Sequence, residues 1–146
     1  MPISPTTLIN QGEIYFCEPD PADTVGSEQE GDRPWVIMSI PRLNRGNCVV
    51  GLPLSRHVEK ACAHLIKIPA TEQTMDDPTQ DTAIDRVALV DQIRALDKTR
   101  FRRKLGFVSV RAITAINLGL DYLFGDATPP VTPRPAALPA TEKKPN

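Results

Sequence analysis

The chain has few of the features that would place it outside a reducing compartment. Its three cysteines, Cys17, Cys48 and Cys62, form no CxxC pair, and an odd number without such a pair disfavours a disulfide framework. No apolar run approaches the roughly 18 residues that a membrane-spanning helix needs. No basic N-terminal segment precedes an apolar core, as it would in a signal peptide. We therefore expect a cytoplasmic protein with no membrane partner.

The chain has no marked excess of positive or negative charge, and it has few histidines. The formal net charge is -1, from 17 basic and 18 acidic residues, so the overall balance indicates neither a nucleic-acid nor a membrane partner. The chain has 2 histidines. The spacing of His57, Cys62 and His64 fits no standard zinc pattern. We predict that the protein needs no metal and no cofactor.

Proline, in contrast, is abundant, with 15 residues in a chain of 146. The length fits one domain. Residues 1–11 are expected to form a flexible lead-in and residues 12–125 a single folded domain. Residues 126–146 are rich in proline and have no apolar period, so we expect a disordered tail.

Short strand candidates follow one another closely after the lead-in. They are residues 12–17, 35–40, 48–54 and 64–69, with one or two more strands within 86–97. The first alternates and predicts a half-buried strand, with Ile14 and Phe16 on one face. Residues 70–82 are polar and acidic and are expected to form a loop. Such closely spaced strands favour a small barrel or sandwich over a βαβ fold.

One helix is predicted near the end of the chain, from about Val110 to Phe124. Ser109 is a candidate N-cap, and Gly125 is a suitable stop. The apolar positions recur at helical spacing and are Ile113, Ile116, Leu120 and Leu123. The pattern predicts a helix that packs one face against the sheet.

Several segments line up in order with one protein family. They are GEIYFCEPDP, GSEQEGDRP, VVGLPLS, VALVDQIRALD and LGFVSVRAITAINLGLDYLFG. Together they resemble the MazF/PemK (Kid) toxins of type II toxin–antitoxin systems, from about Gly12 to Gly125. The GxEQxGxRP loop of that family is complete between Gly26 and Pro34, and its DQIRxLD motif is intact from Asp91 to Asp97.

The resemblance implies a fold and an activity. The fold would be mainly β, an SH3-like β-barrel of the MazF/CcdB type with a C-terminal α-helix. The protein would be a homodimeric, metal-independent endoribonuclease that cleaves single-stranded RNA or mRNA at selected sequences. Attack by the ribose 2′-hydroxyl would leave a 2′,3′-cyclic phosphate and a 5′-hydroxyl. A cognate MazE/PemI-like antitoxin would inhibit it by occupying the RNA groove.

By resemblance, four residues are candidates for catalysis: Arg33, Ser55, Glu28 and Asp91. Arg33 matches the catalytic arginine of the family, and its fork can grip two phosphate oxygens. Ser55 stands where many members have threonine and keeps the hydroxyl donor. Glu28 is better suited to orienting Arg33 than to removing a proton from a hydroxyl. Asp91 matches a residue treated as the base in Kid-like members.

Two departures from the family keep other readings open. Ser27 stands where some members have histidine, and Leu89 replaces an arginine found two residues before the Kid aspartate. No residue of this chain is therefore an obvious candidate for transferring the proton. One alternative is a catalytically silent homologue that only binds antitoxin. The other is a gyrase-poisoning toxin like CcdB, although the complete arginine-bearing loop argues against it.

Half of the candidate RNA contacts lie in a basic segment between residues 94 and 104. A charge run alone is weak evidence for phosphate binding, because it is more often a solvated face. With the resemblance, the expected RNA-binding residues are Gln29, Gln92, Arg94, Lys98, Arg100 and His57. Trp35 lies inside an apolar run and is expected to belong to the core rather than to stack on a base.

Overall fold

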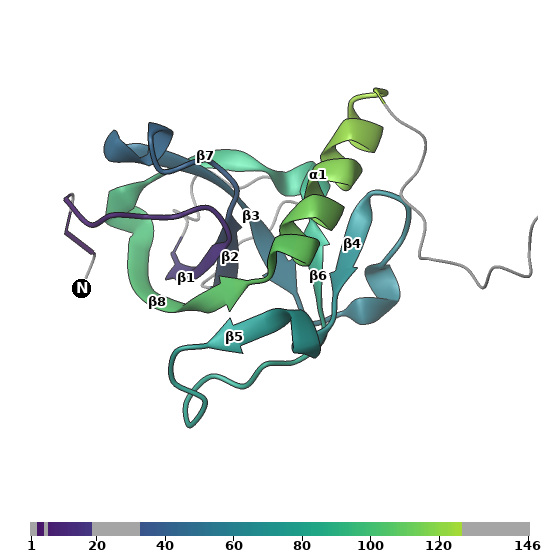
Figure 1. Cartoon of the computed structure of the whole chain (residues 1–146), viewed down its shortest axis with the longest axis horizontal. Helices are drawn as coiled ribbons and strands as arrows, with labels where there is room; N and C mark the ends of the chain where they lie inside the picture. Colours follow the sequence, from purple (N-terminus) through teal and green to yellow (C-terminus); the bar gives the residue numbers. More distant parts are fainter. Residues whose placement is uncertain (1–2, 5, 19–32, 127–146) are drawn as a thin grey trace, which may run out of the picture.

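Antiparallel strands dominate the part of the chain that the structure describes, residues 3–4, 6–18 and 33–126 (Figure 1). In this computed structural model the strands are β1 (Glu13–Cys17), β2 (Arg33–Ile37), β3 (Cys48–Ser55), β4 (Leu65–Ile68), β5 (Gln73–Met75), β6 (Arg86–Leu89), β7 (Arg94–Asp97) and β8 (Phe101–Val108). Short 3-10 helices within the described residues join them: η2 (Leu43–Arg45), η3 (Val58–Lys60), η4 (Ala70–Glu72), η5 (Val90–Gln92) and η6 (Lys98–Arg100). The α-helix α1 (Val110–Leu123) follows β8.

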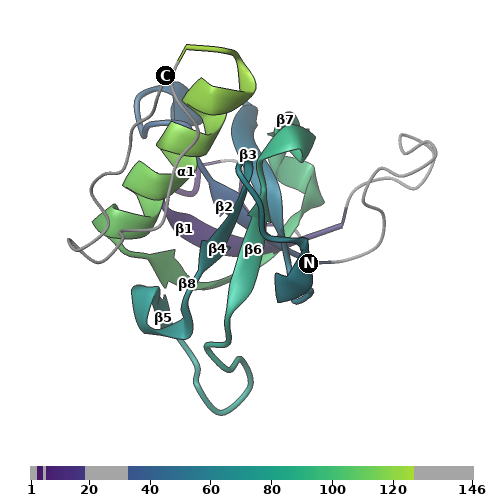
Figure 2. The same cartoon turned by 90° about the vertical axis from the view of Figure 1, so that its right-hand side faces the viewer.

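The strands pair in the order β4-β6-β3-β2-β1-β8-β5, and β7 pairs with β3 as a branch. The long strand β3 makes this branch possible, because its first half pairs with β7 and its last two residues pair with β6. Figures 1 and 2 show that the sheet curls and that α1 lies across one side of it. Among the described strands β4 and β5 end the path without pairing to each other, so the barrel is open. The predicted mainly β class with a C-terminal helix is confirmed.

The curled sheet is apolar on both faces, and each face has its own core. The core on the α1 side includes Ile14, Val36, Leu52 and Ile116. The second core includes Tyr15, Trp35, Leu96 and Phe101. Trp35 is therefore a core residue, as predicted. The prediction that the first strand is half-buried is wrong. Tyr15 is 3 % exposed and Cys17 is 0 % exposed, although both lie on the face that was expected to meet solvent.

The predicted helix is confirmed at both ends. The Ser109 side chain accepts a hydrogen bond from the backbone N–H of Ala112 at 3.1 Å, as an N-cap should. Past the helix, Gly125 adopts a positive φ of 82° that favours glycine. At Gly119 a Cβ atom would lie 2.8 Å from Cγ1 of Ile66. The glycine thus lets α1 lie close against β4.

Two segments were predicted wrongly. Residues 70–82 were expected to be a loop, yet they contain η4 and the three-residue strand β5. The strand β8 was not expected, although it pairs with both β1 and β5. Basic residues crowd its centre, and register shifts in its pairing with β1 interrupt the period of two, so the buried Phe101, Leu105 and Val108 show no regular alternation in the sequence.

Two other predictions concern the ends of the chain and the membrane. Of the predicted lead-in, only residues 1–2 and 5 lie outside the described residues, and its Ile9 is 0 % exposed within the second core. The proline-rich tail beyond residue 126 lies outside the described residues. Within the described ranges, no helix has the length and apolar character needed to cross a membrane.

Candidate active site

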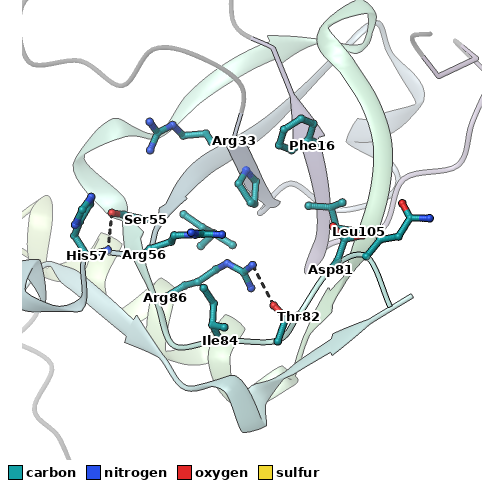
Figure 3. Close-up of a pocket in the computed structure, with 13 residues that line it drawn as sticks. Phe16, Arg33, Ser55, Arg56, His57, Asp81, Thr82, Ile84, Arg86 and Leu105 are labelled. Atoms are coloured by element: carbon teal, nitrogen blue, oxygen red, sulfur yellow. Dashed lines mark hydrogen bonds between the residues drawn. The ribbon is translucent and has the colours of Figure 1, made fainter. Parts of the chain in front are cut away.

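A pocket of about 500 Å³ lies where β2 begins and β3 ends (Figure 3). Its lining includes Arg33 from β2, Ser55 from β3 and Arg86 from β6. Strand register explains why the first two meet. Trp35 pairs with Pro53, and continuing this antiparallel register by two residues brings Arg33 level with Ser55. Figure 3 shows both residues on one side of the pocket.

Arg33 is the first residue of β2, and its backbone is held in place there. Its backbone pairs with that of Cys17, and Pro34 restricts it to an extended conformation. The side chain is half-buried, and burial lowers the pKa of its guanidinium. Arginine remains charged despite such a shift, because its pKa begins far above neutrality. The pocket therefore contains a fixed cation whose position depends on the β1–β2 ladder.

Ser55 is almost completely buried, with 3 % of its surface exposed. Its Oγ accepts a hydrogen bond from the backbone N–H of His57 at 3.1 Å, and Figure 3 draws this contact. Because a hydroxyl is both donor and acceptor, the accepted bond leaves the Ser55 proton able to point at an anion in the pocket. The His57 ring is 68 % exposed, and its Nδ1 lies 3.4 Å from the carboxylate of Glu59.

The wall opposite Ser55 is formed by the segment between β5 and β6. It contributes Asp81 and Thr82, and the Thr82 carbonyl accepts a hydrogen bond from Arg86. Arg103 of β8 donates to both carboxylate oxygens of Asp81, at 2.7 and 3.0 Å. The negative charge of this acid is thus largely offset from outside the pocket.

The comparisons with known proteins identify the family. Residues 10–124 match the model of the PemK-like, MazF-like toxin of type II toxin–antitoxin system. The chain belongs to this family. A curated relative, Endoribonuclease MazF of Staphylococcus saprophyticus, is 30 % identical over 119 residues, which are 81 % of this chain and 92 % of the relative. A second Endoribonuclease MazF, from Staphylococcus epidermidis, is 32 % identical over 119 residues.

Solved structures support the fold of this PemK-like, MazF-like toxin. Crystalline MazF from Deinococcus radiodurans superposes with a TM-score of 0.65 at 20 % identity, covering 82 % of this chain and 98 % of that one. An endoribonuclease from Mycobacterial species, solved in complex with its cognate antitoxin, gives a TM-score of 0.58 at 23 % identity. That alignment covers 83 % of this chain and 99 % of that one.

The structure brings only some of the predicted catalytic residues of the toxin together. Arg33 and Ser55 line the same pocket, and so does His57, which was predicted to contact RNA rather than to catalyse. Asp91 lies in η5, exposed, and is not among the pocket residues. Glu28 lies outside the described residues. The general base therefore stays a prediction without a structural position.

The predicted RNA contacts are also dispersed over the toxin. Gln92 ends η5 and Arg94 begins β7, whereas Lys98 and Arg100 begin and end η6. Lys98 is buried, with 4 % of its surface exposed. None of these four lines the pocket, and Gln29 lies outside the described residues. Their role in RNA binding stays a prediction.

Sequence reasoning missed two arginines of the pocket, Arg56 and Arg86. Arg56 directly follows Ser55, so its position beside the site could have been inferred from the chain alone. Arg86 is the first residue of an apolar strand, and a basic residue in that position predicts a strand end exposed to solvent. Only the register that pairs Ser55 with Val87 places the neighbouring Arg86 beside the site.

Potential metal ligands are dispersed in the described part of the toxin. Within residues 3–4, 6–18 and 33–126, no three His, Cys, Asp or Glu side chains lie close enough together to hold an ion. The contact between Cys62 Sγ and His64 Nδ1, at 3.7 Å, lies at an exposed turn.

Proposed function

We propose that this toxin cleaves single-stranded RNA in the pocket that contains Arg33 and Ser55. The observation that carries the proposal is the convergence of these two residues from separate strands, in a chain whose relatives are endoribonucleases. An arginine fork and a hydroxyl donor are suited to one phosphate group. They could hold it and stabilise the charge that develops on its oxygens.

The reaction needs no metal and no water in its first step. The ribose 2′-hydroxyl loses its proton to a base, and its oxygen forms a bond to the adjacent phosphorus. The bond from phosphorus to the 5′-oxygen breaks, and that oxygen takes up a proton. The products are a 2′,3′-cyclic phosphate and a 5′-hydroxyl. Arg33 stabilises the non-bridging oxygens of the phosphorane, and Ser55 donates a hydrogen bond to one of them.

The same proposal includes partners and location. An antitoxin related to MazE or PemI would inhibit the enzyme, as supported by a structural neighbour solved with its antitoxin. We expect the active species to be a homodimer in the cytoplasm, where the RNA substrate is found. Selection of the cleaved sequence would depend on residues around the pocket rather than on Arg33, because phosphate contacts carry no base information.

The decisive experiment uses purified toxin without antitoxin, a long single-stranded RNA and excess EDTA. Wild type should give discrete cuts with 5′-hydroxyl ends, and an Arg33→Ala variant with an unchanged melting temperature should give none. Intact RNA with wild type would contradict the proposal, as would cleavage that EDTA abolishes. Arrest of gyrase on DNA, with RNA left intact, would instead place the toxin in the other functional class.

A further inference from the structure

Arg86 is an almost buried cation inside the pocket, with 7 % of its surface exposed. Its guanidinium donates from Nη1 to Oε1 of Gln73 at 2.5 Å and from Nη2 to the Thr82 carbonyl at 3.4 Å. Both acceptors are neutral. A guanidinium has five N–H donors, so these contacts leave others for a ligand.

Gln73 fixes the orientation of this cation before any ligand arrives. Its amide Nε2 donates to the carbonyls of Ile68 at 3.1 Å, Pro69 at 3.3 Å and Ile84 at 2.8 Å. Because those carbonyls can only accept, the amide cannot flip, and Oε1 must face Arg86. Such support from surrounding side chains is typical of a group that is held ready for a ligand.

The electrostatic surroundings of Arg86 are unfavourable for a cation that has only a structural role. Burial lowers the pKa of Arg86, nearby Arg56 lowers it further, and Asp81 partly opposes this effect. Asp81 itself is bonded to Arg103. Among the described residues no carboxylate hydrogen-bonds to Arg86. Burying a charge without a counter-charge is costly, so an anion entering the pocket would relieve the cost.

We propose that Arg86 binds the RNA phosphate next to the one held by Arg33 and Ser55, an inference that rests on the proposed function. Figure 3 shows Arg33 and Ser55 on one side of the pocket and the Arg86 guanidinium directed toward Thr82 on the other. A strand of RNA crossing the pocket would present successive phosphates to the two sides. Arg86 thus contributes to substrate binding rather than to the stabilisation of the phosphorane.

The main test compares Arg86→Gln with Arg86→Lys and with Arg111→Gln, which removes the same charge from an exposed position on α1. The substrate is a short RNA containing a site mapped with wild type. Arg86→Gln should raise KM about tenfold and change kcat by less than about threefold, since a hydrogen bond to a charged group is lost. Arg86→Lys should recover part of the loss, and Arg111→Gln should resemble wild type.

A second readout uses RNA with 2′-O-methyl groups, which blocks the attacking hydroxyl. The slope of log Kd against log salt concentration should fall by about 0.7 in Arg86→Gln, as expected when one phosphate contact to a single strand is lost. Arg86→Lys should keep the wild-type slope. This binding measurement needs no cleavage. If wild type fails to cut RNA, the proposed function fails, while the role of Arg86 in phosphate binding is still decided.

An unchanged KM and slope in Arg86→Gln would overturn the inference, and so would a loss confined to kcat. If Arg86→Gln shows no cooperative melting transition, the exposed Thr82 provides the test in a chain that keeps the arginine. Thr82→Glu adds a negative charge at the pocket wall and should give a higher KM than the matched neutral variant Thr82→Gln. Equal KM values for the two Thr82 variants would overturn the inference.

Discussion

Two groups of basic side chains lie in very different surroundings in this molecule. The β8 basic group is Arg102, Arg103 and Lys104, and the inner pocket pair is Arg56, which is exposed, and Arg86, which is buried. Each member of the β8 basic group forms an ion pair, with Glu18, Asp81 and Glu13 respectively, and Lys104 also lies 3.9 Å from Asp76. Among the described residues, neither Arg56 nor Arg86 forms an ion pair with an acid. The two groups carry charge of the same sign but differ in how much of it remains unpaired for a ligand.

The difference shows why a basic run in a sequence is a poor guide to a phosphate site. The β8 basic group belongs to the densest stretch of positive charge in the chain, yet its charge is offset by neighbouring acids. The two arginines of the inner pocket pair are 29 intervening residues apart, so the sequence does not show them as a cluster. Three-dimensional pairing, rather than local density, determines where an RNA backbone would find an unsatisfied cation.

The largest effect on activity is expected at the first cation of the pocket. Arg33→Lys keeps the charge but loses the planar fork that can hold two phosphate oxygens. We expect the single-turnover cleavage rate to fall by about 100-fold, in the range seen when one donor to a developing oxyanion is removed. The melting temperature should change little. A lysine variant within about threefold of wild type would show that charge alone is sufficient at this position.

A smaller loss of activity is expected at Ser55, which supplies a neutral donor. Ser55→Ala removes the hydroxyl and should lower kcat about tenfold, with KM nearly unchanged, because the lost bond forms mainly in the transition state. Ser55→Thr keeps the hydroxyl and should stay within about threefold of wild type. Since the hydroxyl also accepts from the His57 backbone N–H, a melting curve must accompany the rates. An equal loss in both variants would indicate that packing, not hydrogen bonding, determines the effect.

These two residues were predicted from sequence because they stand within continuous motifs. An arginine before a proline at a strand start and a serine at a strand end are ordinary surface features, so the match to the family motifs, rather than the local pattern alone, identified them. Arg86 was missed because its relevance depends on register across β3, β6 and β4, and on the buried amide of Gln73. Such contacts join residues that are distant in the chain, and no local pattern reports them.

The fold shows the same division between local and non-local information. The helix was predicted well because Ser109, Gly125 and the apolar spacing between them are local signals. The strand β8 was missed because the β8 basic group lies at its centre and because register shifts against β1 interrupt its period of two. The second core was missed as well. The face of β1 that carries Tyr15 is buried only because Phe101 and Trp35 arrive from other strands, with the Tyr15 and Phe101 ring centroids 5.2 Å apart.

Arg103 offers a direct contrast with Arg86, and a small effect is expected. The Arg103 side chain is 49 % exposed. It donates two hydrogen bonds to the carboxylate of Asp81, which is 14 % exposed. Arg103→Gln should lower stability by less than about 1 kcal/mol, as is usual for exposed pairs. It should raise KM by less than about threefold, because it frees the Asp81 charge at the pocket wall. Asp81→Asn should lower KM slightly.

The Arg103 and Asp81 variants, with their double mutant, form a thermodynamic cycle measured by KM and thermal melting. If the β8 basic group contacts RNA directly, Arg103→Gln will raise KM as much in the Asp81→Asn background as in wild type. If Arg103 acts only by offsetting the acid, the double mutant will resemble Asp81→Asn alone. The cycle therefore separates the two roles of positive charge that the comparison distinguishes.

The smallest expected effect concerns Asp97, the acid within the basic segment. Its carboxylate accepts from the Thr99 backbone N–H at 2.9 Å. This bond, followed by one from the Thr99 side chain, lowers the pKa of Asp97, and the charge of Arg100 contributes less. The folded state thus prefers the ionised form. The stabilisation is present above the unfolded pKa of about 3.9 and is lost as the pH falls through the lower folded value.

Asp97→Asn should therefore melt slightly below wild type at pH 7, and the two melting curves should converge as the pH falls below about 4. Because a backbone N–H rather than a basic neighbour is the main cause, raising the salt concentration to about 0.5 M should leave most of the difference at pH 7. Loss of the difference in salt would show that the basic segment stabilises its own acid through long-range charge. The segment would then differ less from the inner pocket pair than its contacts indicate, because its charges would act collectively rather than in closed pairs.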